Sequence, residues 1–137
     1  MTLVLDAGPL VALADRRDPM QPAIEQLLRD EAGQLLVPLP VATEVDYLLG
    51  RRGGRGPRLA FLDDLVSGRL ALEGLSATDL ATVRDLEGRY PELDAGLADL
   101  SVVVIAARHR TSRVATFDDH FRVLRPLDGE PAFTVLP

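Results

Sequence analysis

The chain has 137 residues and a net charge of −6, and 47% of its residues are hydrophobic, which suits one domain with a buried core. It contains neither cysteine nor lysine, so all 15 basic residues are arginine. These absences exclude disulfides, thiolate metal sites, cysteine nucleophiles, the lysine-dependent phosphate loop and Schiff-base enzymes. With two histidines and 21 acidic residues, the abundant metal ligand is carboxylate oxygen, which suits Mg²⁺ or Mn²⁺ better than zinc.

The negative charge counts against a nucleic-acid partner, because phosphate binding favours basic surfaces, unless the acids gather around a metal ion that reverses the local sign. No apolar run approaches the length of about 20 residues that a membrane helix needs. The first residues do not form a signal-peptide pattern, because Asp6 directly follows Leu3–Leu5. We therefore expect a cytoplasmic protein without a membrane partner.

Short apolar runs alternate with helical periodicities along the chain. In order, the first half predicts a strand at 3–5, a helix from 10, a helix opened by Asp18-Pro19, a strand at 35–37 and a helix from about 41 to 50. The second half predicts a helix from 59, a strand at 70–72, a helix capped by Ser76, an apolar helix at 97–109, and strands at 114–115 and 133–136. Between the halves, Arg51–Arg58 is predicted to be a flexible basic loop, too short to link two domains.

Strands that alternate with helices predict an α/β protein with a mostly parallel sheet, and we expect a single domain over residues 1–137. The last strand is expected at an edge of this sheet. In such folds, ligands collect just beyond the carboxyl ends of the strands. Residues that directly follow a strand, or that begin the helix after it, are therefore candidates for a functional site.

Four acids stand at such positions: Asp6, Glu44, Asp99 and Asp118. Each also has a structural interpretation, because acids often end strands, cap helices, occupy turns or complement the positive end of a helix dipole. Their joint placement nevertheless predicts a shared pocket. Carboxylates held together repel one another unless a divalent cation binds between them. Two such ions about 4 Å apart can activate water and stabilise an in-line phosphoryl transition state, so phosphodiester hydrolysis is the natural reaction.

Four segments carry a resemblance to a known family. They are Leu3–Leu10 (LVLDAGPL), Val41–Val45 (VATEV), Leu97–Val104 (LADLSVVV) and Val114–Phe121 (VATFDDHF). In these segments and their order, the chain resembles PIN-domain nucleases, in particular the VapC-type toxins of bacterial toxin–antitoxin pairs. The resemblance runs nearly from end to end, and it implies a PIN-like α/β/α sandwich.

The resemblance also implies roles for individual residues. Asp6, Glu44, Asp99 and Asp118 would be the metal ligands and catalytic acids, and Thr116 would supply a supporting hydroxyl. The family's Thr-x-Asp-x-x-Phe pattern fits Thr116, Asp118 and Phe121, which favours Asp118 over its neighbour Asp119. Gly8 departs from the pattern, because many relatives carry a hydroxyl side chain there. The role of Asp94 stays open, with a solvated turn as the simpler interpretation.

The activity implied by the resemblance is that of an Mg²⁺-dependent endoribonuclease toxin, with Mn²⁺ as a substitute cofactor. RNA would be the substrate, a cognate VapB-type antitoxin would neutralise the protein, and a homodimer is expected. Arg51–Arg58 would either hold RNA phosphates or serve only as a solvated connection. The chemistry does not require His109 or His120, which we expect to be peripheral.

Two other functions are compatible with parts of the sequence. One is a catalytically silent PIN-like module that only binds a protein partner; the presence of all four acids disfavours it. The other is a phosphatase of the haloacid dehalogenase type, which also places an acid after the first strand. That class needs a second Asp where this chain has Gly8, and it typically uses a lysine, which this chain lacks.

Overall fold

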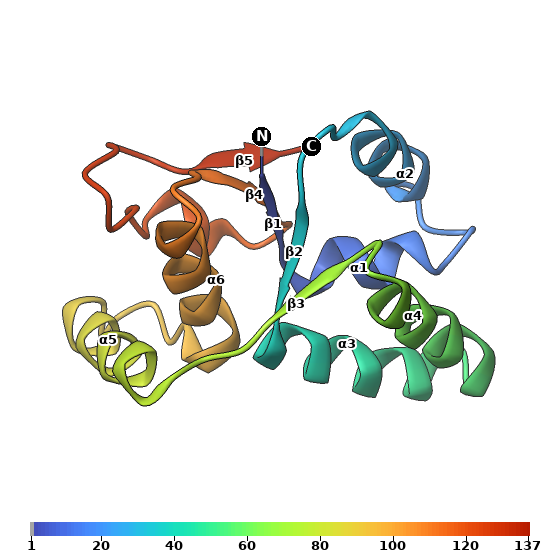
Figure 1. Cartoon of the computed structure of the whole chain (residues 1–137), viewed down its shortest axis with the longest axis horizontal. Coiled ribbons are helices and arrows are strands. Elements are labelled where there is room, and N and C mark those ends of the chain that lie inside the picture. Colours follow the sequence, from blue (N-terminus) through green and yellow to red (C-terminus); the bar gives the residue numbers. More distant parts are fainter. Residues whose placement is uncertain (1) are drawn as a thin grey trace.

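The computed structural model describes residues 2–137, which form a five-stranded sheet covered by helices (Figure 1). The strand order is β3-β2-β1-β4-β5, and every neighbouring pair is parallel, so the predicted mostly parallel sheet is confirmed. β5 lies at one edge, as predicted. The strands are β1 (Leu3–Leu5), β2 (Leu35–Pro38), β3 (Ala71–Glu73), β4 (Arg113–Ala115) and β5 (Thr134–Leu136).

Figure 1 shows α5 and α6 on one side of the sheet and α1, α2 and α4 on the other, while α3 runs along the edge where the strands end. The helices are α1 (Ala7–Leu13), α2 (Gln21–Asp30), α3 (Leu39–Arg52), α4 (Arg55–Ser67), α5 (Ala77–Arg89) and α6 (Gly96–Arg108), with a 3₁₀ turn at Asp119–Arg122. This arrangement is the expected α/β/α sandwich. Among residues 2–137, none of the helices is both long and apolar enough to span a membrane.

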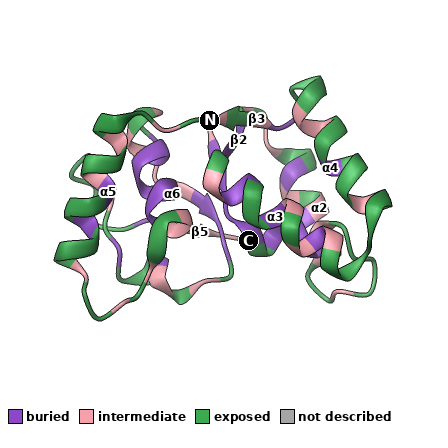
Figure 2. Ribbon diagram, turned by 90° about the horizontal axis from the view of Figure 1, so that it is seen from below, coloured by how far each residue is buried: buried purple, intermediate pink, exposed green. Residues whose placement is uncertain are grey.

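The core extends over both faces of the sheet, and α6 forms much of it on one side. All residues of β1 and β2 are buried, and so is the continuous stretch Leu100–Ala106 in α6. α6 contacts three strands, α3 and α5, so it has no solvent-exposed face along this stretch, as the purple colour in Figure 2 shows. A helix that is apolar all round is buried in this way. The helix that carries Asp99 is therefore anchored in the interior.

The predicted basic loop at Arg51–Arg58 is wrong. α3 continues to Arg52 and α4 begins at Arg55, so only Gly53 and Gly54 connect the two helices. Arginine is a good helix former, and Pro57 falls in the first turn of α4, where the missing N–H costs no helical hydrogen bond. The chain turns at Gly54, whose φ of 78° lies in the region that favours glycine. The arginines of this segment therefore lie at the C-terminus of α3 and the N-terminus of α4.

Helix boundaries also differ slightly from the prediction. Asp18-Pro19 precedes α2 but does not open it, because the Asp18 carboxylate accepts a hydrogen bond of 2.8 Å from the backbone N–H of Met20 in a turn before the helix. Ser76 is the N-cap of α5, as predicted. Phe133 precedes β5, and its ring packs edge-on against Phe121 with the ring centroids 5.8 Å apart.

Candidate active site

A cavity of about 500 Å³ lies at the carboxyl ends of β1 and β4, where the sequence predicts ligand binding. All four predicted acids line it, together with a few neighbouring residues (Ala7, Gly8, Phe117, Asp119 and His120). Asp6 directly follows β1, Glu44 lies in the second turn of α3, Asp99 is in the first turn of α6, and Asp118 follows β4. Residues that are far apart in the sequence thus meet in one place.

Asp6 is held on both of its carboxylate oxygens. One accepts a hydrogen bond of 2.8 Å from the backbone N–H of Ala7, which makes Asp6 the N-cap of α1. The other accepts a hydrogen bond of 2.7 Å from the Thr116 hydroxyl. Asp6 is buried, and burial raises its pKa despite these two hydrogen bonds. Because it is buried, this carboxylate is costly to ionise without a nearby cation.

Thr116 links two of the acids. Its hydroxyl donates to Asp6 and accepts a hydrogen bond of 3.0 Å from the backbone N–H of Asp118. Thr116 itself is buried at the end of β4. One side chain therefore fixes the carboxylate of Asp6 and the backbone that carries Asp118. This is the position in which the resemblance expected a supporting hydroxyl.

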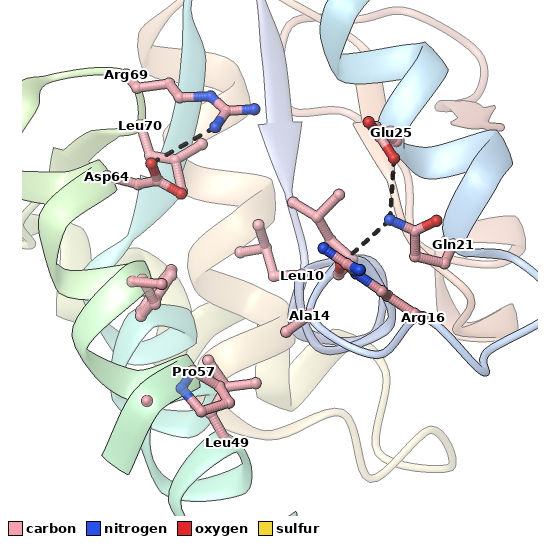
Figure 3. A pocket seen from close by; sticks show the side chains of 14 residues that line it. Leu10, Ala14, Arg16, Gln21, Glu25, Leu49, Pro57, Asp64, Arg69 and Leu70 are labelled. Carbon is pink, nitrogen blue, oxygen red and sulfur yellow. Dashed lines mark hydrogen bonds and ion pairs between the residues drawn. The ribbon is translucent and has the colours of Figure 1, made fainter. Parts of the chain in front are cut away.

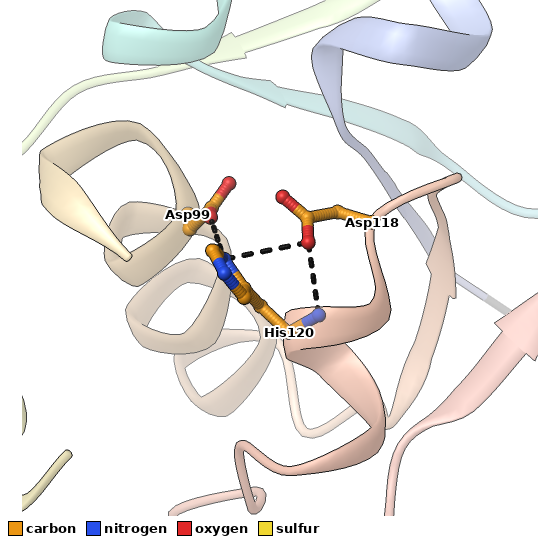
Figure 4. A group of neighbouring side chains, drawn as sticks. All are labelled: Asp99, Asp118 and His120. Atoms are coloured by element: carbon orange, nitrogen blue, oxygen red, sulfur yellow. Dashed lines mark hydrogen bonds and ion pairs between the residues drawn. The ribbon is translucent and has the colours of Figure 1, made fainter. Parts of the chain in front are cut away.

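Asp99 and Asp118 meet at His120 (Figure 4). His120 Nδ1 lies 2.8 Å from Asp99 Oδ2 and 3.3 Å from Asp118 Oδ1. The same Asp118 oxygen accepts a hydrogen bond of 2.9 Å from the backbone N–H of His120. These three residues offer ligand atoms that all lie within 4.8 Å of one another. Asp6 and Glu44 line the same cavity without belonging to this tightest group.

The expectation that His120 is peripheral is therefore wrong. His120 lies in a tight 3₁₀ turn that begins right after Asp118, and this turn directs the imidazole back toward the acids. The available signal was Asp118 itself, because an Asp side chain often accepts a hydrogen bond from the backbone N–H two residues on, and here that residue is His120. His109, in contrast, contacts Glu73 at the far end of α6 and does not line the cavity.

The electrostatics of the cavity favour a cation. Burial raises the pKa of Asp99 to about 6, with repulsion from Asp6 and Asp118 adding to it, although the hydrogen bond with His120 acts in the opposite direction. Burial and the charges of Asp6 and Asp118 also raise the pKa of Glu44. The hydrogen bond to Asp99 raises the pKa of His120. Among the cavity-lining residues that the structure describes, none is an arginine.

Two further acids near the site have simpler roles. The Asp119 side chain is 93% exposed and lies 3.3 Å from Arg122, although the residue stands on the rim of the cavity. Asp94 does not line the cavity; it adopts a left-handed turn (φ 49°) shortly before α6. Asp is among the residues that tolerate this conformation. The geometry places Asp118, and not Asp119, beside Asp99.

A second cavity, of about 520 Å³, lies between α1, α2 and α4 (Figure 3). Its lining is mainly apolar, with Leu10, Leu49 and Leu70 among the side chains drawn. Its charged residues are largely paired: Arg69 lies 3.6 Å from Asp64, and Gln21 donates to Glu25 at 3.0 Å. Because it does not gather unpaired acids, this cavity does not suit metal-dependent chemistry.

Comparison with known proteins identifies the family and the fold. Residues 3–125 match the family model of the PIN domain. Over 136 residues, the chain is 33% identical to Ribonuclease VapC26 of Mycobacterium tuberculosis. The aligned region covers 98% of this chain and 100% of that relative.

Two solved structures share the fold. The crystal structure of Mycobacterium tuberculosis VapC20, described as a toxin that cleaves the sarcin-ricin loop, has a TM-score of 0.83 at 18% identity and covers 94% of this chain and 99% of that one. The crystal structure of VapBC2 from Rickettsia felis, bound to a DNA fragment from its promoter, has a TM-score of 0.70 at 18% identity and covers 100% of both chains. The predicted PIN-like fold is thereby confirmed.

Proposed function

The chain belongs to the PIN-domain family, and from this membership we propose that it is an Mg²⁺-dependent endoribonuclease toxin that a cognate antitoxin holds inactive. The observation that carries this proposal is the single cavity at the strand ends that Asp6, Glu44, Asp99 and Asp118 share. In a protein without catalytic cysteine or lysine, such a cavity has metal-assisted hydrolysis as its natural chemistry.

The donor set fits a divalent cation. Four carboxylates converge, burial raises the pKa of Asp6 and Asp99, and no arginine among the described lining residues neutralises them. We propose that these four acids hold Mg²⁺, with Mn²⁺ as a substitute, because both ions prefer oxygen ligands. When bound, the ion supplies charge neutralisation for the acids and polarisation of the phosphodiester.

The side chains of this chain supply the positioning. Thr116 and the backbone N–H of Ala7 fix both oxygens of Asp6, so its carboxylate cannot rotate away from the cavity. Asp99 is anchored by the buried helix α6, and Glu44 by α3. Preorganised charges of this kind cost little reorganisation when a reaction occurs. Asp118 is oriented by the turn that also places His120.

RNA as the substrate and a VapB-type antitoxin as the partner rest on the relatives. Ribonuclease VapC26 is named for RNA cleavage, VapC20 is described as cleaving the sarcin-ricin loop, and VapBC2 was solved on promoter DNA. We propose that an antitoxin arginine pairs with the acids of the cavity and so displaces the metal ion, since arginine binds carboxylates in a two-pronged geometry. A homodimer is part of the same proposal.

The test uses purified protein, total RNA and Mg²⁺, with EDTA as the metal-free arm. Asp6→Asn and Asp99→Asn should each lower cleavage by at least about 100-fold, because the loss of a metal ligand strongly weakens both metal binding and activity. Asp119→Asn is the matched control, since its side chain is 93% exposed and paired with Arg122, and it should retain cleavage. Undiminished cleavage by Asp6→Asn would refute the proposal.

The alternative function, a catalytically silent PIN-like module, predicts the opposite result. A module that only binds protein should leave RNA intact in every arm. Calorimetric titration with Mn²⁺ adds an independent measure, because the proposed site should bind the ion and lose that binding in Asp99→Asn. Metal binding that does not depend on the acids, together with intact RNA, would favour the silent module.

A further inference from the structure

Phe117 is an exposed aromatic residue at the edge of the acidic cavity. The chain buries its other three phenylalanines (Phe61, Phe121 and Phe133), yet Phe117 remains 44% exposed. It stands between Thr116 and Asp118 in sequence, and it lines both the acidic cavity and the neighbouring one toward β5. Part of the Phe117 side chain is therefore accessible to a substrate bound in the acidic cavity.

The ring rests on the backbone of Gly8. A Cβ atom at Gly8 would lie only 3.1 Å from Phe117 Cδ2 and 3.6 Å from Cγ, so a side chain there would require the ring to shift by a few tenths of an ångström. Gly8 is in the first turn of α1, two residues after Asp6. The ring therefore lies close against Gly8, while 44% of the residue remains exposed.

We propose that Phe117, seated on Gly8, is a stacking platform for an unpaired RNA base next to the phosphodiester that is cleaved. The inference rests on the proposed function and adds how the substrate is held. Aromatic side chains bind single-stranded nucleic acid by stacking on successive bases, and this contact does not depend on sequence. A base inside a duplex is not available for it, so the cleaved nucleotide must lie in a loop or a single strand.

The charge of the site supports stacking as the source of affinity. The chain carries a net charge of −6, and no arginine appears among the described residues that line the cavity. His120, the basic side chain among the described lining residues, already contacts Asp99 and Asp118, so a bound metal ion is the main attraction for backbone phosphates. A ring that binds the face of a base works without charge. It can hold the substrate where electrostatic attraction is weak.

A short oligoribonucleotide that contains a cleavage site mapped with the wild-type protein provides the test. Phe117→Leu keeps an apolar side chain without a ring face, and it should raise KM about tenfold with a smaller change in kcat, as expected for a lost base stack. Phe117→Tyr should behave like the wild type. Val66→Ala, at a position 87% exposed on α4, is the control for removal of an exposed apolar side chain.

A spectroscopic measurement separates stacking from a structural role. Oligoribonucleotides with 2-aminopurine at single positions around the cleavage site are bound to Asp99→Asn protein, which should not cut them. Stacking on Phe117 should quench the fluorescence at one position, and the quenching should disappear in the Asp99→Asn/Phe117→Leu double variant. Gly8→Ser should weaken the quenching although the ring is still present, because the added side chain displaces it.

The outcomes are distinct. If the wild-type protein does not cleave RNA at all, the proposed function fails. If the wild-type protein cleaves RNA but Phe117→Leu changes neither KM nor the quenching, the stacking platform is refuted. Weaker inhibition by the cognate antitoxin, with an unchanged KM for RNA, would also refute it, because the ring would then serve as an apolar contact for that protein.

Discussion

At the scale of single residues, the Thr116 hydroxyl connects two of the acids in the site. It donates to Asp6 at 2.7 Å and accepts from the backbone of Asp118 at 3.0 Å, and the residue is only 3% exposed. Thr116→Val keeps the shape but removes both hydrogen bonds. Because a buried hydrogen bond to a charged group contributes about 1.5–3 kcal/mol, kcat/KM should fall by roughly 10- to 100-fold.

Thr116→Ser is the matched control, because it retains the hydroxyl, and it should keep most of the activity. Both variants should fold, since the change in side-chain volume is small and Thr116 directly follows the buried residues Val114 and Ala115. Equal kcat/KM values for the valine variant and the wild type would show that the hydroxyl does not organise the acids.

The raised pKa of Asp99 predicts how stability depends on pH in metal-free protein. Its pKa is about 6 in the folded state against an ordinary value of 3.8 for an aspartate in water, so the folded state holds the proton more tightly. Asp99 therefore supports stability below about pH 3.8, and this contribution is lost as pH rises to about 6. Asn cannot ionise, so Asp99→Asn should not lose this contribution. The free energy of unfolding of the variant minus that of the wild type should therefore be larger at pH 7.5 than at pH 4.5.

Between pH 4.5 and pH 7.5, this difference in the free energy of unfolding should grow by about 1–2 kcal/mol. This magnitude follows from about 1.4 kcal/mol for each pKa unit between pH 4.5 and the folded-state pKa of about 6. Urea unfolding of both proteins in EDTA at the two pH values measures it. The comparison cancels the titration of groups distant from Asp99, and it reports Asp99 together with His120, whose pKa the Asp99 contact raises. A difference in stability that does not change with pH would mean that Asp99 ionises freely in the fold.

Some residues of the site could be placed from the sequence, and others could not. Asp6 and Asp118 follow predicted strands and Asp99 begins a predicted helix, so their meeting at one sheet edge could be predicted from element order. His120 and Phe117 could not be placed in this way. Their positions depend on how one tight turn packs against α6 and α1, and such contacts between distant residues leave no periodic pattern in the sequence.

At the scale of secondary-structure elements, α5 offers a test that is separate from the active site. The Ser76 hydroxyl accepts a hydrogen bond of 3.1 Å from the backbone N–H of Asp79, and the Asp79 carboxylate accepts one of 2.8 Å from the backbone N–H of Ser76. Ser76→Ala breaks the first of these and should lower the free energy of unfolding by about 1 kcal/mol. Urea unfolding measures the change, and RNA cleavage should stay normal. Loss of cleavage in a folded Ser76→Ala protein would contradict this separation.

The elements themselves were largely predictable, and the exceptions have physical causes. Buried strands such as Leu3–Leu5 are continuous apolar runs, and α6 is an apolar stretch too long for a strand. The segment Arg51–Arg58 was misjudged because its glycines suggested a loop. Only two of them, Gly53 and Gly54, interrupt the helices, whereas Gly56 and Pro57 are tolerated in the first turn of α4.

At the scale of the whole molecule, a net charge of −6 and a cavity of repelling acids predict that a divalent cation stabilises the fold. A ligand that binds only the folded state at about 100 times its Kd adds about 2.7 kcal/mol, which should raise Tm by several degrees. Thermal unfolding at pH 7.5 with and without Mn²⁺ measures this shift. Asp99→Asn should show a smaller shift, whereas Asp119→Asn should match the wild type. An equal shift in all three proteins would place the ion outside the cavity.

The burial of α6 has a consequence for how the protein opens. Backbone amides exchange slowly with deuterium when only global unfolding exposes them. The amides of Leu100–Ala106 lie in the middle of the core, so they should be among the last to exchange, while the exposed turns of α5 and α2 exchange earlier. Partial opening of the outer helices would then leave the backbone that carries Asp99 in its native place.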